Sequence, residues 1–416
     1  MPFFRLVALA ACLLIPFAPH VSHAESVSGP ASTLPVASTT PIASSVPVAS
    51  VRVAGAPVEP VTFWLPSAKP SGIEVNDRVW VSFYAAAGAS ASAPAPAVVL
   101  LHYLGTTRNA EMHRYARTLS RQNISAAVVT LPYHMQRAVG KTEPMQYFVS
   151  RDANVAVRAF EQGISDVSTV VTWLTAQSIV DKRRIGVVGV SLGAITAHVA
   201  MGRDARLSAG VALLGGGDLP DIYETSPAGR IFLHTQARRL TEAEKAQLRT
   251  VDPLTYAGQN QPRRVLMIQG ARDSFIPQRD ALELWRALGR PPIQWIDTNH
   301  AALLLAIDSA GRAATTYLRN VWSGNFNAPI PRVHVPTIQI GLMTGLDALI
   351  TPVIQLQVLR IGTRHHMALA HVDAGLGTRG LFAGLAATVT PLVDVGVGRR
   401  LGGTRWRPYT SLHITF

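Results

Sequence analysis

The chain has 416 residues, of which 48% are hydrophobic and 15% charged, and its formal net charge is +13. This length is enough for two domains, and the apolar fraction is enough for a sizeable core. Because the basic residues form no dense block interleaved with aromatic residues, we expect no nucleic-acid partner. A cationic surface that faces anionic lipid explains the charge more naturally.

Residues 1–24 resemble a secretion signal, in which Arg5 precedes an apolar run and small residues lead to an expected cleavage after Ala24. A lipoprotein signal ending at Cys12 is the alternative, although little apolar sequence precedes that cysteine. Cleavage after Ala24 would remove the only cysteine, which excludes a disulfide scaffold, a cysteine nucleophile and cysteine-bound zinc. We therefore expect an exported protein of the periplasm or the outer membrane.

Residues 25–60 are rich in serine, proline and alanine, and prolines recur every few residues. Neither a helix nor a strand ladder can propagate through such a sequence, so we expect a flexible linker.

Strand and helix patterns then alternate through residues 61–325. Strands are expected at 79–84, 97–101, 126–131, 185–190, 209–214, 265–269 and 293–296, and helices at 110–122, 154–177, 194–201, 277–288 and 301–321. Residues 219–256 are polar and partly helical, which is typical of a cap-like insertion. The alternation predicts an α/β fold with a mostly parallel sheet, helices on both faces and functional groups at the carboxyl ends of its strands.

The strongest local pattern is Gly-Val-Ser-Leu-Gly at residues 189–193, between an expected strand and an expected helix. A strand, a sharp turn and a helix are the setting of a nucleophile elbow, in which the serine hydroxyl projects from the sheet edge. Gly189 and Gly193 would let the strand and helix approach without a Cβ clash. The alternative interpretation is an ordinary glycine-flanked turn in which Ser191 only caps the helix.

A serine nucleophile needs a base, and the base needs an acceptor that fixes its tautomer. His300 and Asp273 each follow an expected strand and are the candidates for these roles. The order Ser191, Asp273, His300 is the one that this arrangement uses. Asp218 also follows a strand end and is a rival for the acid, whereas His102 is better explained as a histidine that fixes a loop by hydrogen bonds.

These motifs make residues of about 60 to 322 resemble an α/β-hydrolase, nearest to the dienelactone hydrolase and prolyl-oligopeptidase-like esterase branch. The resemblance rests on GVSLG, on DPLTYA followed by VLMIQGARDSFIP, and on TNH before the last helix. It implies Ser191 as nucleophile, Asp273 as acid and His300 as base. It also implies an oxyanion hole that includes the backbone N–H of Leu192.

The second oxyanion donor departs from the family pattern. Where the family often has His-Gly-x-Gly, this chain has His-Tyr-Leu-Gly at residues 102–105. The donor is therefore expected to be the N–H of Tyr103 or of Leu104. A missing donor would weaken transition-state stabilisation by about 2.7–4 kcal/mol, so this departure bears on activity.

We therefore expect a secreted serine hydrolase that cleaves small carboxylic esters through an acyl-enzyme and needs no cofactor. A serine peptidase of the same fold is one alternative, and a non-catalytic outer-membrane binding or assembly module is another. His365, His366 and His371 could be mistaken for metal ligands. However, His366 falls on the other face of the strand and no carboxylate has a suitable spacing, so we expect no metal.

From residue 332 to 416 the helical spacing stops and short alternating runs appear. Val393, Val395 and Val397 alternate with small or polar residues, which is typical of outer-membrane strands. A final Phe416 after alternating apolar residues also resembles the closing strand of outer-membrane β-barrel proteins. We therefore expect an antiparallel all-β segment that associates with the outer membrane.

The number of strands does not match that expectation. A spanning strand needs about 9–11 residues, so this segment is long enough for about five or six strands. Single-chain barrels start at about eight strands. We therefore expect several copies of the chain to share one barrel as a homo-oligomer. A soluble, sandwich-like β domain is the alternative.

Overall fold

The computed structural model describes residues 59–226, 239–260, 264–335, 337–346, 350–364, 367–377, 380–390 and 392–415. The expected signal peptide, Cys12 and nearly all of the expected linker lie outside the described residues, as do His365, His366 and Phe416.

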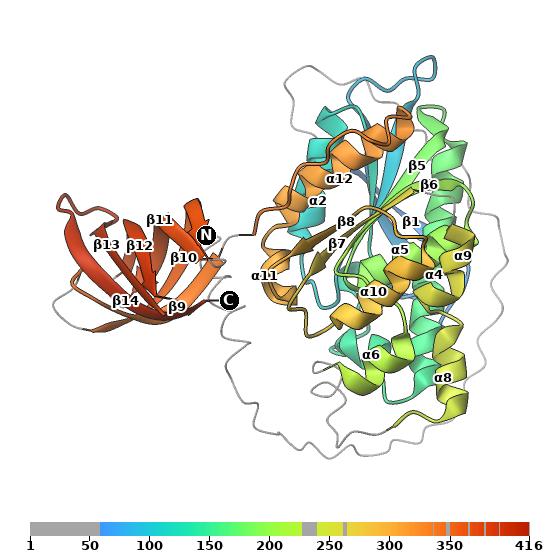
Figure 1. Ribbon diagram of the computed structural model, residues 1–416. Coiled ribbons are helices and arrows are strands. Elements are labelled where there is room, and N and C mark those ends of the chain that lie inside the picture. The colour runs from blue at the N-terminus through green and yellow to red at the C-terminus, as the bar shows by residue number, and fades with distance from the viewer. Residues whose placement is uncertain are drawn as a thin grey trace. The chain divides into compact units, whose positions relative to one another are not determined.

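An eight-stranded sheet forms the first part of the structure (Figure 1). Its strands are β1 (Val61–Pro66), β2 (Arg78–Tyr84), β3 (Ala95–Leu101), β4 (Ser125–Val129), β5 (Val180–Val190), β6 (Leu207–Leu213), β7 (Arg264–Gly270) and β8 (Ile293–Ile296). The spatial order is β1-β2-β4-β3-β5-β6-β7-β8. Only the pairs that involve β2 are antiparallel. All other neighbours are parallel, as a doubly covered α/β sheet requires.

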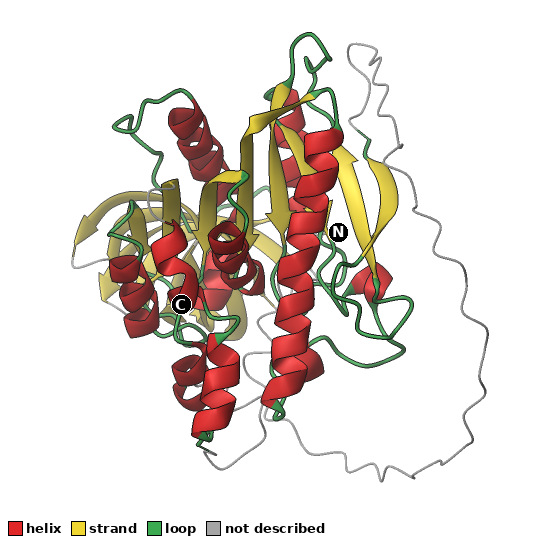
Figure 2. Cartoon of the chain, turned by 90° about the vertical axis from the view of Figure 1, so that its right-hand side faces the viewer, coloured by secondary structure: helices red, strands yellow, loops and turns green. Residues whose placement is uncertain are grey.

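Helices cover both faces of this sheet (Figure 2). The long helices are α2 (Ala110–Arg121), α4 (Ala153–Ala176), α5 (Leu192–Arg203), α10 (Gln278–Ala287) and α12 (Ile307–Trp322). Shorter ones are η1 (Met135–Arg137), α3 (Met145–Phe148), α6 (Leu219–Thr225), α8 (Glu242–Arg249), η2 (Pro253–Tyr256), α9 (Ala257–Asn260) and α11 (His300–Leu304). None of the helices in the described ranges is both long and apolar enough to cross a bilayer.

Each face of the sheet has its own apolar core. α2 and α12 bury one stripe each, which includes Met112 and Leu119 on α2 and Leu318 on α12, in the same cluster as Val98 of β3. α4, α5 and α10 pack on the opposite face, in the same cluster as Val99. The alternation of Val98 and Val99 between the two clusters follows from the two-residue period of a strand. This arrangement confirms the predicted α/β fold.

Two elements differ from the sequence-based prediction. β1 was not predicted, and half of its positions are exposed because it is an edge strand, which leaves little hydrophobic pattern. The expected single closing helix is two helices, α11 and α12, joined at Leu305 and Ala306. The N–H groups of these two residues bond three residues back, to Ala302 and Leu303. Such tightening ends a helix without a proline or glycine to mark it in the sequence.

A buried ion pair ties the amino-terminal hairpin to the rest of the sheet. Arg137 Nη1 lies 2.7 Å from Asp166 Oδ2, and both side chains are fully buried. The same guanidinium donates to the carbonyl oxygens of Asn76 and Thr130, and Ser67 Oγ donates to Asp166. Burial raises the pKa of Asp166, although Arg137 acts in the opposite direction. The pair therefore joins the β1–β2 hairpin, the segment after β4 and α4.

The C-terminal part is a closed antiparallel barrel, coloured orange to red in Figure 1. Its strands are β9 (Thr337–Thr344), β10 (Thr351–Arg364), β11 (Met367–Gly377), β12 (Gly380–Thr390), β13 (Val393–Arg400) and β14 (Arg407–Thr415). The expected antiparallel all-β segment is thus confirmed.

The expectation that one chain cannot close a barrel is wrong. β14 pairs with β9, so six strands close within a single chain and no second copy is needed for closure. The domain is also not a sandwich. A narrow barrel becomes possible because glycines face its large interior rings: a Cβ on Gly384 would lie 2.9 Å from the ring of Tyr409, and a Cβ on Gly398 would lie 3.2 Å from it. Strand tilt and shear also set closure, and apolar alternation does not reveal them.

Candidate active site

The Gly-Val-Ser-Leu-Gly segment is the sharp turn between β5 and α5. Ser191 has φ 53° and ψ −113°, a strained conformation that a non-glycine residue rarely adopts. A Cβ on Gly189 would overlap the carbonyl of Gly193. A Cβ on Gly193 would lie 2.5 Å from the carbonyl oxygen of Leu101 at the end of β3. Both glycines are therefore required by close backbone approach.

The three predicted site residues lie at the carboxyl ends of three parallel strands and form one hydrogen-bonded chain. His300 Nε2 lies 3.0 Å from Ser191 Oγ. His300 Nδ1 lies 2.7 Å from Asp273 Oδ2. The His300 and Asp273 side chains are only 7% and 2% exposed. Because an ionised carboxylate only accepts, His300 carries its proton on Nδ1 and presents the Nε2 lone pair to the serine.

Backbone groups fix the orientation of the acid and the base. The second carboxylate oxygen of Asp273 accepts from the N–H groups of Phe275 at 2.8 Å and Ile276 at 2.9 Å. His300 is the first residue of α11, and Asn299 caps that helix by accepting from Ala302 N–H at 2.9 Å. The acid therefore cannot rotate away from the imidazole without breaking two further hydrogen bonds.

Asp252, in the DPLTYA segment, supports the loop that follows β6. Its carboxylate accepts from the N–H groups of Asp218, Leu219 and Leu254. Burial raises the pKa of Asp252 to about 6 in spite of these bonds. Sequence reasoning quoted this segment but assigned no role to Asp252. Asp218, the rival acid, caps α6 by accepting from Asp221 N–H at 3.2 Å.

Two buried histidines hold the loop after β3. His102 Nε2 accepts from Leu131 N–H at 3.0 Å, so Nδ1 donates to the Tyr103 carbonyl at 2.9 Å. His134 Nε2 accepts from Gly105 N–H at 3.2 Å, and its Nδ1 donates to Pro132. Burial lowers the pKa of His134 to about 4 and, together with the nearby His134, lowers that of His102 well below its usual value. Both rings therefore stay neutral at physiological pH.

This loop brings the expected oxyanion donors to the elbow. Leu192 is the first residue of α5, so its N–H lies at the helix N-terminus, where an anion is favoured. Tyr103 and Leu104 lie two and three residues after the end of β3, against which Gly193 packs. Sequence reasoning missed His134, because nothing in the sequence relates it to Gly105.

Comparisons with known proteins agree with this geometry. Residues 155–308, which include Ser191, Asp273 and His300, match the model of the prolyl oligopeptidase family. This match covers less than half of the chain. A search of the curated proteins finds no match. The fold is that of the α/β-hydrolases, and Ser191, His300 and Asp273 form one hydrogen-bonded chain within the matched residues.

Solved structures with a similar fold include peptidases and esterases. An acylaminoacyl peptidase of Pyrococcus horikoshii is 15% identical with a TM-score of 0.49, and the match covers 66% of this chain and 42% of the peptidase. An esterase of Pyrococcus furiosus is 16% identical with a TM-score of 0.45, covering 64% of this chain and 93% of the esterase. A 2,6-dihydroxy-pseudo-oxynicotine hydrolase is 18% identical with a TM-score of 0.46, and the match covers 66% of this chain and 71% of that hydrolase.

Proposed function

We propose that this protein cleaves carboxylic esters through an acyl-enzyme, with Ser191 as nucleophile, His300 as general base and Asp273 as orienting acid. The observation that carries the proposal is the unbroken chain of hydrogen bonds from Ser191 through His300 to Asp273. The strained backbone of Ser191, which points the hydroxyl out of the turn, supports it.

The geometry accounts for each step. Ser191 Oγ donates its proton to His300 Nε2 as it attacks the ester carbonyl, and Asp273 stabilises the imidazolium that forms. The N–H of Leu192 and that of Tyr103 or Leu104 bind the oxyanion. His300 then returns the proton to the leaving alcohol, and water repeats the sequence on the acyl-enzyme.

The first test is hydrolysis of p-nitrophenyl esters of increasing acyl length by the chain that begins at Glu25. We expect measurable activity, and a loss of about four or more orders of magnitude in kcat for Ser191→Ala. Ser323→Ala is a matched control, because Ser323 is an exposed serine after the end of α12 and should leave the activity unchanged. Equal activity in the Ser191→Ala and unmodified proteins would refute the assignment of the nucleophile.

A peptidase is the second candidate, because the matching family model is that of the prolyl oligopeptidases. An ester is the easier substrate, since an alcohol leaves more readily than an amine. Comparing kcat/KM for a p-nitrophenyl ester and a p-nitroanilide with the same acyl group decides between them. Turnover of the anilide as fast as the ester would favour the peptidase. A fluorophosphonate probe that fails to label Ser191 in the folded protein would favour the non-catalytic module instead.

Export is part of the proposal, because residues 1–24 have the pattern of a secretion signal. The mass of the mature protein from the producing cell tests it. A mass that begins at Glu25 supports cleavage after Ala24. A lipid-modified Cys12 supports the alternative signal, and an intact Met1 in the mature protein would refute export by either route.

A further inference from the structure

The interior of the barrel contains a buried polar cluster, which we define as Gln339, His371, Asp373, Asp394 and His413. His371 Nδ1 lies 2.7 Å from Asp373 and Nε2 lies 3.2 Å from Asp394. Gln339 donates to Asp394 at 2.8 Å. The barrel therefore encloses a histidine ring that lies between two carboxylates.

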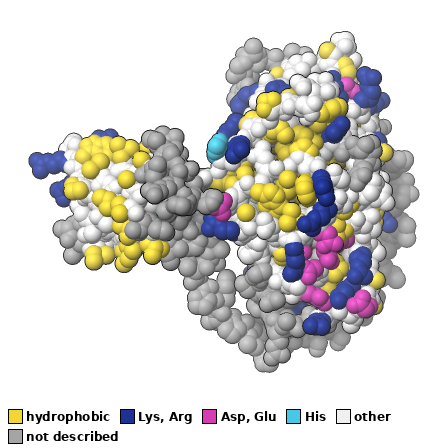
Figure 3. Space-filling view, in the orientation of Figure 1, with side chains coloured by type: hydrophobic (Ala, Val, Ile, Leu, Met, Phe, Trp, Pro, Cys, Tyr) yellow, Lys and Arg dark blue, Asp and Glu magenta, His cyan; other side chains and the backbone are white. Residues whose placement is uncertain are grey.

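The outer surface of the barrel carries large apolar side chains. Leu385 on β12, Val395 on β13 and Leu412 on β14 are 52%, 46% and 54% exposed. Ten of the thirteen large exposed hydrophobic residues in the described ranges belong to the barrel and its turns. Figure 3 shows that apolar side chains gather on the visible face of the barrel. The barrel therefore has a polar cluster inside, beside a small apolar cluster that includes Met343 and Phe382, and large apolar side chains outside. An exposed apolar surface of this kind marks a site of contact with another molecule or a membrane.

The apolar surface extends around the circumference. On β9, β10 and β11 the outward positions include Leu342, which precedes the buried Met343, and Ile354 and Val372, each of which lies between two buried residues. On β12, β13 and β14 they include the three residues named above. All six strands therefore present apolar side chains outward. A second protein would cover one side of such a surface, whereas hydrocarbon would cover all of it.

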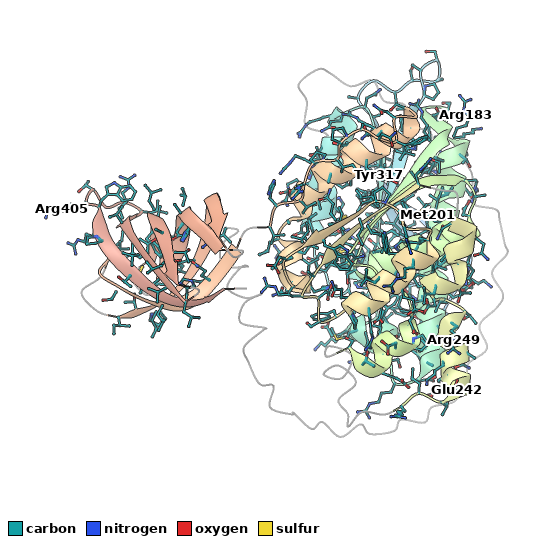
Figure 4. All side chains as sticks on the ribbon, viewed as in Figure 1. Arg183, Met201, Glu242, Arg249, Tyr317 and Arg405 are labelled. Carbon is teal, nitrogen blue, oxygen red and sulfur yellow. The ribbon has the colours of Figure 1, made fainter. Side chains whose placement is uncertain are left out.

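Positive charge gathers at one end of the barrel. Arg399 and Arg400 end β13, Arg405 lies in the following loop and Arg407 begins β14. Arg405 marks this end in Figure 4. The middle of β12, β13 and β14 carries no outward charge at the described positions. An apolar band beside a basic rim is the arrangement that matches acyl chains beside anionic lipid headgroups.

We propose that the barrel formed by β9–β14 inserts into a lipid bilayer, with its outer surface against acyl chains and the arginine end at the headgroups. Closure satisfies the requirement that no unpaired strand edge faces lipid. The strands have 8 to 14 residues, against about 9–11 for a tilted spanning strand. Six strands are fewer than the usual minimum of about eight, and the buried polar cluster fills the interior instead of a pore.

The experiment uses the full chain with Cys12→Ser, which removes the only cysteine. Single cysteines are introduced at Leu385, Val395 or Leu412 and labelled with the environment-sensitive fluorophore NBD. The matched control is Val75→Cys, which is 41% exposed in the hydrolase domain. The proteins are refolded with vesicles of phosphatidylcholine and phosphatidylglycerol. We expect a blue shift, and quenching by lipids with nitroxide-labelled acyl chains, at the three barrel sites but not at Val75.

Unchanged emission at the barrel sites would overturn the proposal. So would a blue shift without quenching by lipid, because it would indicate contact with another copy of the chain. A second measurement needs no substitution: the unmodified protein should float with vesicles through a density gradient in high salt, and its failure to float would also overturn the proposal. Neither readout depends on ester hydrolysis, so insertion and the proposed catalytic function fail independently.

Discussion

At the scale of single residues, the position of the active-site loop depends on one close backbone approach and on two buried histidine rings. Gly193 packs against the end of β3, and His102 and His134 hold the loop that follows it. The turn that carries Ser191 and the loop that carries the expected oxyanion donors are therefore positioned by the same contacts. A change that separates them should alter catalysis before it alters folding.

Gly193→Ala tests this coupling. The added Cβ would lie 2.5 Å from the Leu101 carbonyl oxygen and 2.7 Å from that of His102, so it must displace α5 from the loop. We expect kcat for p-nitrophenyl esters to fall about 10²–10³-fold, as for loss of an oxyanion donor. Gly258→Ala is the control, because nothing lies within 4 Å of its added Cβ. Equal activity of the two variants would contradict this account.

His198 on α5 should limit stability in acid. It is 1% exposed, burial lowers its pKa to about 4, and its ring nitrogens find no hydrogen-bond partner within the described part of the chain. Since the unfolded chain takes up the proton near pH 6.5 and the native chain only near pH 4, stability must fall as the pH drops through this window. The full loss is about 3 kcal/mol.

His198→Leu should remove that loss and stabilise the protein by about 1–3 kcal/mol at neutral pH, because two unpaired polar atoms disappear. Urea unfolding of both proteins at pH 7 and pH 5 measures the difference in their free energies of unfolding. This difference should be larger at pH 5. An identical pH dependence for the variant and the unmodified protein would show that His198 is paired or accessible.

At the scale of elements, what could be predicted from the sequence depended on distance along the chain. The sequence predicts the strand, turn and helix around Ser191, because they form a local pattern. The same holds for the loops of Asp273 and His300, which each follow a strand. The pairing of Arg137 with Asp166 and the narrow closure of the barrel around Tyr409 could not be predicted, because they depend on which distant segments meet.

Arg137→Met tests the element-level role of the buried pair. It leaves the Asp166 carboxylate buried without its charged partner, and we expect the free energy of unfolding to fall by about 3–5 kcal/mol. Arg114→Met is the matched control: Arg114 pairs with Asp308 at the surface, where both side chains are more than half exposed. That control should change stability by less than about 1 kcal/mol. Similar effects of both substitutions, measured by denaturant unfolding, would contradict the prediction.

At the scale of the whole molecule, the apolar cores are separate. The last buried residue of one sheet cluster is Leu288 and that of the other is Val333. The barrel has a cluster of its own that includes Met343, Phe382 and Tyr409. The two parts should therefore unfold in two transitions rather than one.

Calorimetry of the full chain in detergent measures this directly. Arg137→Met should lower only the transition of the hydrolase domain. Phe382→Ala removes a ring that is 2% exposed, and it should lower only the transition of the barrel. A single transition that shifts with either substitution would mean that the two parts fold as one cooperative unit.

The pairing of β14 with β9 also sets the order of events during synthesis. β9 is the first strand of the barrel to be made and β14 the last, so the seam between them cannot form until all six strands have left the ribosome. Until that pairing forms, the first and the last strand each present an unpaired edge. Both edges disappear in the same event, when β14 pairs with β9.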